Sequence, residues 1–63
     1  MLDGENAIRV YRDYRGLTQE KLAAEVGISV PYLSQLEGGK RKGSLDVVSR
    51  VARALRVDLE KLV

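Results

Sequence analysis

The densest group of charged side chains in this 63-residue sequence is the run Lys40-Arg41-Lys42. Glycines flank the run at Gly38-Gly39 and at Gly43, which favours a loop. Lysine and arginine side chains on a loop can bind an anion such as a phosphate group. A basic run of this kind is more often a solvated loop without a ligand, so these residues alone do not decide between the two interpretations.

The composition excludes several other kinds of chemistry. The sequence contains no cysteine and no histidine, which removes zinc fingers, redox motifs and catalysis by a thiol or an imidazole. No paired carboxylates with an evident cleft are present, and a chain this short rarely encloses a pocket. The net charge is only +2, with 11 basic and 9 acidic residues, so charge alone is poor evidence for nucleic acid. We therefore expect no enzymatic activity, no cofactor and no metal.

Length and hydropathy predict one small folded domain over residues 1–63. The hydrophobic fraction of 44% fits a folded chain. No apolar run approaches the roughly 18 residues of a membrane span, and no signal peptide is evident. We expect a cytoplasmic protein without a membrane partner. The first predicted helix begins within a few residues of Met1, which is also compatible with a segment cut from a longer protein.

Helical periodicity recurs along the chain. Apolar residues three and four apart, bounded by capping residues and glycines, predict short helices. Thr18, Ser29 and Ser44 are expected N-caps, Gly27 suits the position after the second helix, and Pro31 is tolerated in the first turn of the third. The helices are expected at about 5–14, 19–26, 30–37 and 45–55, with a last short one beginning at Asp58. The predicted fold class is all-α, a compact five-helix bundle.

The segment Gln19–Gly38 has the spacing of a helix-turn-helix motif. Two helices crossing at roughly 90–120° need a small residue where they meet, and Ala23 stands there. Gly27 accepts the positive φ that the turn requires. Apolar side chains then fill the angle between the helices, namely Ile28, Leu33 and Leu36. Five matches at fixed positions predict this motif far more specifically than one glycine pattern.

With these residues the chain resembles the Cro/cI-type (XRE) helix-turn-helix repressors from about Ile8 to Leu62. The resemblance is carried by the segments Arg15–Ala24, Gly27–Ser29, Tyr32–Arg41 and Ala52–Leu62. It implies a lambda-repressor-like five-helix bundle whose third helix, at about 30–37, enters the major groove of DNA. It also implies a sequence-specific transcriptional regulator, expected to be a repressor. A bundle of the same shape that does not bind DNA is the alternative.

The N-terminus and outer face of the third helix are expected to reach base edges in the major groove. The residues there are Val30, Pro31, Ser34 and Gln35. Gln35 can make a bidentate contact to adenine N6 and N7, whereas Val30 and Pro31 offer only apolar contact to thymine methyl groups. The family often has polar residues at 30 and 31, so we predict modest, A·T-leaning specificity helped by DNA shape. The alternative is that Val30-Pro31 merely starts the helix.

The resemblance also implies phosphate contacts that fix the protein's register on DNA. It points to the N-terminus of the second helix at Gln19 and to the hydroxyl of Tyr32. It further points to the loop residues Lys40, Arg41 and Lys42, which follow the recognition helix directly. About three to five phosphates neutralised per protomer give an expected salt slope of roughly −3 to −5.

Two charged features have an expected structural role. The family pairs an arginine of the first helix with a glutamate ending the third, and Arg12 and Glu37 match those positions. A bidentate pair would fix the recognition helix to the first helix; a catalytic acid at Glu37 is the alternative. Arg50, Arg53 and Arg56 recur every three residues, which is typical of a solvated face, with contacts to a second subunit or to flanking phosphates as the alternative.

Partners follow from the same resemblance. Such regulators usually bind pseudo-palindromic operators as homodimers, with half-sites about one helical turn apart. Four C-terminal residues supply either an apolar dimer seam or the closure of the core: Val57, Leu59, Leu62 and Val63. The second functional interpretation is an antitoxin, in which the same domain autoregulates an operon and the protein also holds a toxin. The chain shows no obvious toxin-wrapping tail.

Overall fold

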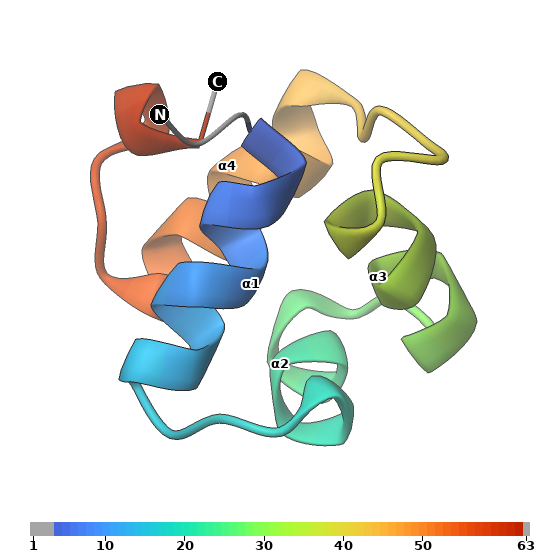
Figure 1. The fold of residues 1–63 in the computed structure, drawn as a ribbon, viewed down its shortest axis with the longest axis horizontal. Helices are drawn as coiled ribbons and strands as arrows, with labels where there is room; N and C mark the ends of the chain where they lie inside the picture. The colour runs from blue at the N-terminus through green and yellow to red at the C-terminus, as the bar shows by residue number, and fades with distance from the viewer. Residues whose placement is uncertain (1–3, 63) are drawn as a thin grey trace.

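The computed structural model describes residues 4–62, and within that range the chain is all-helical, as predicted, with no strand. The elements are α1 (Gly4–Tyr14), α2 (Gln19–Val26), α3 (Val30–Glu37), α4 (Leu45–Leu55) and the short helix η1 (Leu59–Lys61). Figure 1 shows α1 lying across α4, with α2 below it and α3 at the far edge. No helix within this range combines the length and apolar character that a membrane crossing requires.

The last element corrects the expected helix count: residues 4–62 form four α-helices, and the fifth helix expected from Asp58 is a 3₁₀ turn. The N–H of Lys61 donates to the carbonyl of Asp58 at 2.9 Å, and the N–H of Leu62 to that of Leu59 at 2.9 Å. Both bonds span three residues, the pattern of a 3₁₀ helix, and the segment is too short to continue with α-helical bonds. The apolar spacing of Leu59 and Leu62 suits either helix type, so the sequence did not separate them.

The helix termini follow from the capping residues that the sequence supplies. The side-chain oxygens of Thr18, Ser29 and Ser44 each accept from the backbone N–H three residues on, at 3.1–3.2 Å. Each bond satisfies one amide that the first turn of a helix leaves without a partner. Gly27 has φ 84° and ends α2 in the left-handed conformation that the turn into α3 requires.

The core lies where the four α-helices meet. α2 packs against both α3 and α4, and α1 packs against α3 and α4. Ala23, on α2, is 2% exposed, in keeping with the small residue that the motif needs. The buried apolar side chains are Ala7, Ile8, Leu22, Ala23, Val26, Leu33, Leu36, Val51, Ala52, Leu55 and Leu62. Val57 and Leu59 pack against this core, whereas Val63 lies outside the described residues.

Candidate nucleic-acid interface

Helix α3 has one buried and one exposed face. Leu33 and Leu36 point into the core at 0% and 2% exposure. Pro31, Ser34 and Gln35 are exposed. Because successive residues of an α-helix are rotated by 100°, the packing of Leu33 and Leu36 directs Ser34 and Gln35 outward. Three of the four residues expected at base edges therefore lie on the accessible side of α3.

Val30, the fourth of these residues, is placed differently. Its side chain is half-buried and packs against the core, as does that of Ile28 in the turn. Val30 occupies the first helical position, and Pro31 the second, where the missing proline N–H costs no hydrogen bond. Only part of the Val30 side chain is therefore accessible to a ligand.

Arg12 and Glu37 form a bidentate pair between α1 and the end of α3. Arg12 Nε lies 2.7 Å from Glu37 Oε2, and Arg12 Nη2 lies 3.1 Å from Glu37 Oε1. The Arg12 Nη1 group donates to the carbonyl of Leu17 at 2.9 Å. The side chains are 12% and 5% exposed, so both charges are largely removed from water.

The electrostatics of this pair keep Arg12 charged. The hydrogen bond to Glu37 raises the pKa of the Arg12 guanidinium, burial opposes the rise, and the charges of Glu37 and Asp13 add to it. The guanidinium is therefore protonated at every pH at which DNA binding is measured. Glu37 thus has a permanent cationic partner, and the end of α3 is tied to α1.

Gln19 joins the same pair, a contact that the sequence reasoning missed. Its Nε2 donates to Glu37 Oε1 at 3.1 Å, so Glu37 accepts hydrogen bonds from two other elements. Gln19 and Glu37 are 18 residues apart, and no periodic pattern in the sequence connects them. The bond places the N-terminus of α2 against the C-terminal end of α3. It uses one amide hydrogen of Gln19 and leaves the other for a ligand.

The N-terminus of α2 also has free backbone donors. Thr18 Oγ1 takes the N–H of Lys21, and the Thr18 carbonyl takes that of Leu22. Within residues 4–62 no hydrogen-bond partner is recorded for the N–H groups of Gln19 and Glu20. Unpaired amides at a helix N-terminus favour an anion, although the Glu20 carboxylate in the same turn opposes one.

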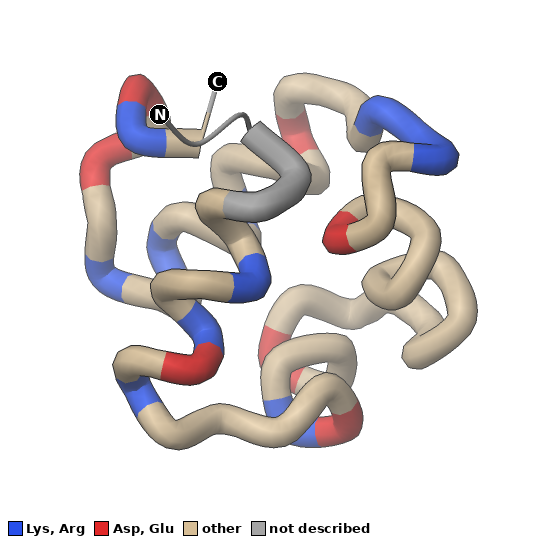
Figure 2. The backbone as a smooth tube through the Cα atoms, in the orientation of Figure 1, with Lys and Arg blue, Asp and Glu red and all other residues tan. Residues whose placement is uncertain are grey.

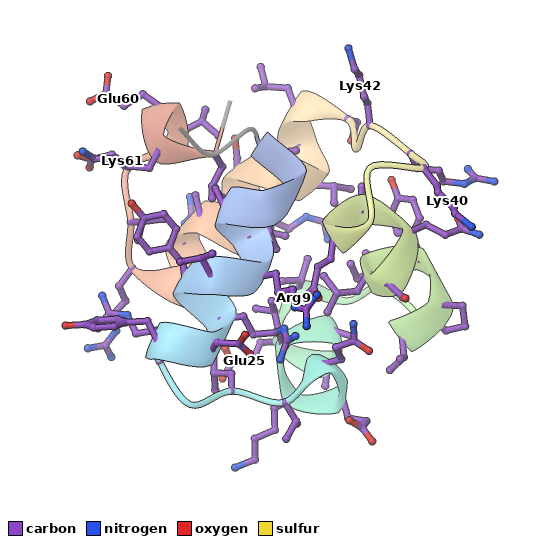
Figure 3. The ribbon with its side chains drawn as sticks, viewed as in Figure 1. Arg9, Glu25, Lys40, Lys42, Glu60 and Lys61 are labelled. Atoms are coloured by element: carbon purple, nitrogen blue, oxygen red, sulfur yellow. The ribbon has the colours of Figure 1, made fainter. Side chains whose placement is uncertain are left out.

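The basic loop Lys40–Lys42 folds back on the end of α3. The backbone N–H groups of Lys40 and Arg41 both donate to the carbonyl of Gln35, at 2.9 and 3.4 Å. Figure 2 shows the loop as a continuous basic segment beside the end of α3, and Figure 3 shows Lys40 and Lys42 projecting away from the protein. The loop is therefore anchored to the helix whose exposed face it flanks.

Arg41 and Tyr32 lie together at the edge between α3 and this loop. The Arg41 guanidinium carbon is 5.9 Å from the centre of the Tyr32 ring, which is within the range of a cation–π contact. Tyr32 is half-buried and packs against the core, whereas Arg41 is exposed. Sequence reasoning assigned both residues separately to phosphates and did not anticipate the contact between them.

The three arginines of α4 and its end are all exposed, as the solvated-face interpretation expects, but Arg50 also makes contacts within the chain. Arg50 Nη1 donates to the carbonyl of Val26 at 3.1 Å, and its Nη2 lies 2.8 Å from Asp46 Oδ2. Arg50 therefore caps the C-terminus of α2, while no such contact is recorded for the side chains of Arg53 and Arg56 among the described residues. The spacing of four residues between Asp46 and Arg50 was the signal that could have predicted the ion pair.

Similarity to known proteins agrees with this geometry. A family model described as helix-turn-helix matches residues 8–62. An uncharacterized HTH-type transcriptional regulator of Mycobacterium tuberculosis is 49% identical over 55 residues, which cover 87% of this chain and 39% of that protein. The chain thus spans less than half the length of this relative.

Two solved structures have the same arrangement of helices. The restriction-modification controller protein C.AhdI from Aeromonas hydrophila matches with a TM-score of 0.89 and 32% identity, over 94% of this chain and 89% of that one. SinR, a master regulator for biofilm formation solved in complex with DNA, matches with a TM-score of 0.87 and 27% identity, over 94% and 98% of the two chains.

Proposed function

The chain belongs to the helix-turn-helix family, and we propose that it binds double-stranded DNA sequence-specifically and regulates transcription. One observation carries the proposal: α3 is fixed from within by Leu33, Leu36 and Glu37, while its opposite face is exposed beside a basic loop. A fixed helix with a free polar face is what the major groove admits. The relatives are regulators of transcription, which is not a class of enzyme.

In this proposal α3 enters the major groove and Gln35 is the main reader of sequence. The Gln35 amide has a donor and an acceptor, which match adenine N7 and N6. Ser34 adds a hydroxyl to the same face, and Pro31 contacts a thymine methyl group. Val30 contributes less than expected because its side chain is half-buried. We therefore retain the proposal of modest, A·T-leaning specificity.

Phosphate contacts on both sides of α3 set its register in the groove. The unpaired N–H groups of Gln19 and Glu20, at the start of α2, are proposed to hold one phosphate. The hydroxyl of Tyr32 and the side chains of Lys40, Arg41 and Lys42 are proposed to hold the others. The backbone bonds from Lys40 and Arg41 to Gln35 support this arrangement, because they fix the loop relative to the reading face.

Repression and dimerisation are further parts of the proposal. A regulator that occupies an operator excludes the transcription machinery from the same DNA, so repression needs no additional surface. A homodimer reading a pseudo-palindrome would place its two α3 helices about 34–36 Å apart. Leu62 is buried and closes the core, whereas Val57 and Leu59 pack on the core but stay partly exposed. The exposed parts of Val57 and Leu59 are therefore kept as the proposed dimer contact.

The antitoxin interpretation gains no specific support. The similar proteins described above are named as regulators of transcription, of restriction-modification and of biofilm formation. No contact within the described residues points to a toxin, and we propose no such partner.

The test is a salt-titrated binding assay on the DNA upstream of the gene, with a scrambled duplex of equal length and composition. We expect specific binding at least about 10³-fold tighter than non-specific binding. Log affinity should fall linearly with log salt concentration, with a slope of about −3 to −5 per protomer. Equal affinity for the two duplexes would defeat the proposal of a specific regulator.

A further inference from the structure

A second polar surface lies away from the proposed DNA interface. The end of α1, the last turn of α2 and the end of α4 border an open depression of about 470 Å³. Its lining residues are Arg15, Leu17, Glu25, Arg53, Ala54 and Arg56. α3 and the basic loop contribute none of them. Small-molecule sites commonly have volumes of about 300–1,000 Å³, so the depression is large enough for a small metabolite.

Positive charge predominates in this depression. Three guanidinium groups and one carboxylate line it, and no ion pair between Glu25 and any of these arginines is recorded among the described residues. The four charged side chains that line the depression therefore carry a net charge of +2, three positive and one negative. The Arg53 side chain is exposed and makes no recorded hydrogen bond within residues 4–62, so its donors face solvent.

Arg15 is held in a fixed position at one side of the depression. Its Nε donates to the carbonyl of Leu55 at 2.9 Å, and its Nη2 donates to that of Arg56 at 3.3 Å. These bonds satisfy carbonyls that the end of α4 leaves without helical partners. They also orient the guanidinium plane, and the remaining donors of Arg15 are free for a ligand.

Arg56 has an unusual backbone conformation at the same place. Its φ is 59° and its ψ is 43°, and among the described residues it is the only one besides glycines with positive φ. A glycine would form this left-handed helix end without strain. Strain of this kind leads to a hypothesis of function. At this position the strained backbone carries the Arg56 guanidinium, which lines the depression.

We propose that this depression binds a small phosphorylated metabolite. A phosphate monoester carries about −1.5 to −2 charges at neutral pH. Such a ligand therefore complements several guanidinium groups better than a ligand with a single carboxylate would. Arg53 and Arg56 contact the phosphate oxygens, and so do the free donors of Arg15. Each guanidinium can donate two parallel hydrogen bonds to the oxygens of one phosphate group. Glu25 accepts a hydrogen bond from a hydroxyl or amino group of the ligand, and Leu17 and Ala54 supply apolar contact.

The binding test uses the full chain and no DNA, so its failure is separate from failure of the proposed function. Ribose 5-phosphate, inorganic phosphate and ribose are titrated at constant ionic strength, and amide and arginine Nε signals are followed by NMR. We expect saturable shifts around the depression, with a dissociation constant below about 1 mM for ribose 5-phosphate. Inorganic phosphate should bind more weakly and ribose should not bind. Non-saturating shifts, or shifts confined to Lys40–Lys42, would overturn the proposal.

Matched variants separate a built site from general attraction of anions. Arg53→Gln removes one exposed guanidinium and should weaken ribose 5-phosphate binding at least about tenfold, a loss of 1.4 kcal/mol. Arg56→Gly retains the left-handed turn and should also weaken binding while the melting temperature is maintained. Arg9→Gln makes the same charge change on an exposed part of α1 outside the depression (Figure 3) and should leave binding unchanged. Equal weakening by Arg9→Gln and Arg53→Gln would mean unspecific attraction only and would overturn the proposal.

The phosphate groups of DNA are the other ligand that the arginines of the depression could bind. A duplex should shift the signals of α3 and the basic loop and leave those of Arg53 and Arg56 unchanged. If the duplex shifts the depression instead, these arginines contact flanking DNA, and the metabolite site is contradicted.

Discussion

The two faces of α3 differ in whether their side chains find packing and hydrogen-bond partners within the chain. On the inner face, Leu33 and Leu36 are buried, and the buried Glu37 carboxylate accepts hydrogen bonds from Arg12 and Gln19. On the outer face, Ser34 and Gln35 are exposed and have no side-chain hydrogen bond recorded in the described part of the chain. The inner face determines where the helix lies, and the outer face is left for a ligand. Substitutions on the two faces should therefore affect different measurements.

The largest expected effect is on the inner face, from Glu37→Ala. The substitution leaves the buried Arg12 guanidinium without its carboxylate, and removing one partner of a buried pair costs about 3–5 kcal/mol. A single small core rarely supplies more than about 3–5 kcal/mol in total. We therefore expect most of the variant to be unfolded at 25 °C, as measured by circular dichroism and urea unfolding.

Two further variants test this explanation. Glu20→Ala removes an exposed glutamate from the first turn of α2 and should change the free energy of unfolding far less. Glu37→Gln retains the side-chain shape and removes the charge, so its loss should be intermediate. A melting temperature unchanged by Glu37→Gln would show that the pair does not hold α3 in solution.

The outer face should respond in the opposite way, and Gln35→Ala is the test. Loss of a bidentate base contact is expected to cost about 1–3 kcal/mol of discrimination between cognate and scrambled DNA. The melting temperature should stay nearly unchanged, because the Gln35 side chain is exposed and its carbonyl, which holds the basic loop, remains. If the ratio of the two affinities is unchanged, Gln35 does not read a base and the assignment fails.

The sequence predicted most of what local chemistry determines. The caps at Thr18, Ser29 and Ser44 and the left-handed Gly27 follow from residue type and position alone. The outer face of α3 follows from the same periodicity, because Leu33 and Leu36 are directed to the core. Contacts between distant segments were not predictable in this way. Gln19 reaches Glu37 across 18 residues, and Arg15 reaches the carbonyl of Leu55 across 40. Such contacts depend on the angles between helices, which no periodic signal encodes.

Substitutions in the basic loop test the contribution of charge, and their expected effect on DNA binding is smaller than that of Gln35→Ala. Lys40→Gln and Arg41→Gln should each flatten the salt slope of binding by about one unit, because each removes one phosphate contact. Lys61→Gln is the matched control: Lys61 is exposed on η1, at the opposite side of the view from Lys40 (Figure 3). Stability should be unchanged in Lys40→Gln and Lys61→Gln, whereas Arg41→Gln should lose only its cation–π contact with Tyr32, about 0.5–1 kcal/mol. A slope that responds equally to Lys61→Gln would indicate a net-charge effect without local contacts.

The smallest expected effect is at Tyr32, which belongs to both faces because its ring packs on the core and lies under Arg41. Tyr32→Phe removes only the hydroxyl and keeps the ring, so it should weaken DNA binding by about 0.5–1.5 kcal/mol, the usual net worth of one hydrogen bond. Tyr32→Leu also removes the cation–π partner of Arg41, worth about 0.5–1 kcal/mol at an exposed site. The salt slope should then flatten by less than it does in Arg41→Gln, because a freely moving guanidinium contacts its phosphate less often but keeps its charge. If Tyr32→Phe and Tyr32→Leu bind DNA equally, the ring does not position Arg41, and Tyr32 acts through its hydroxyl alone.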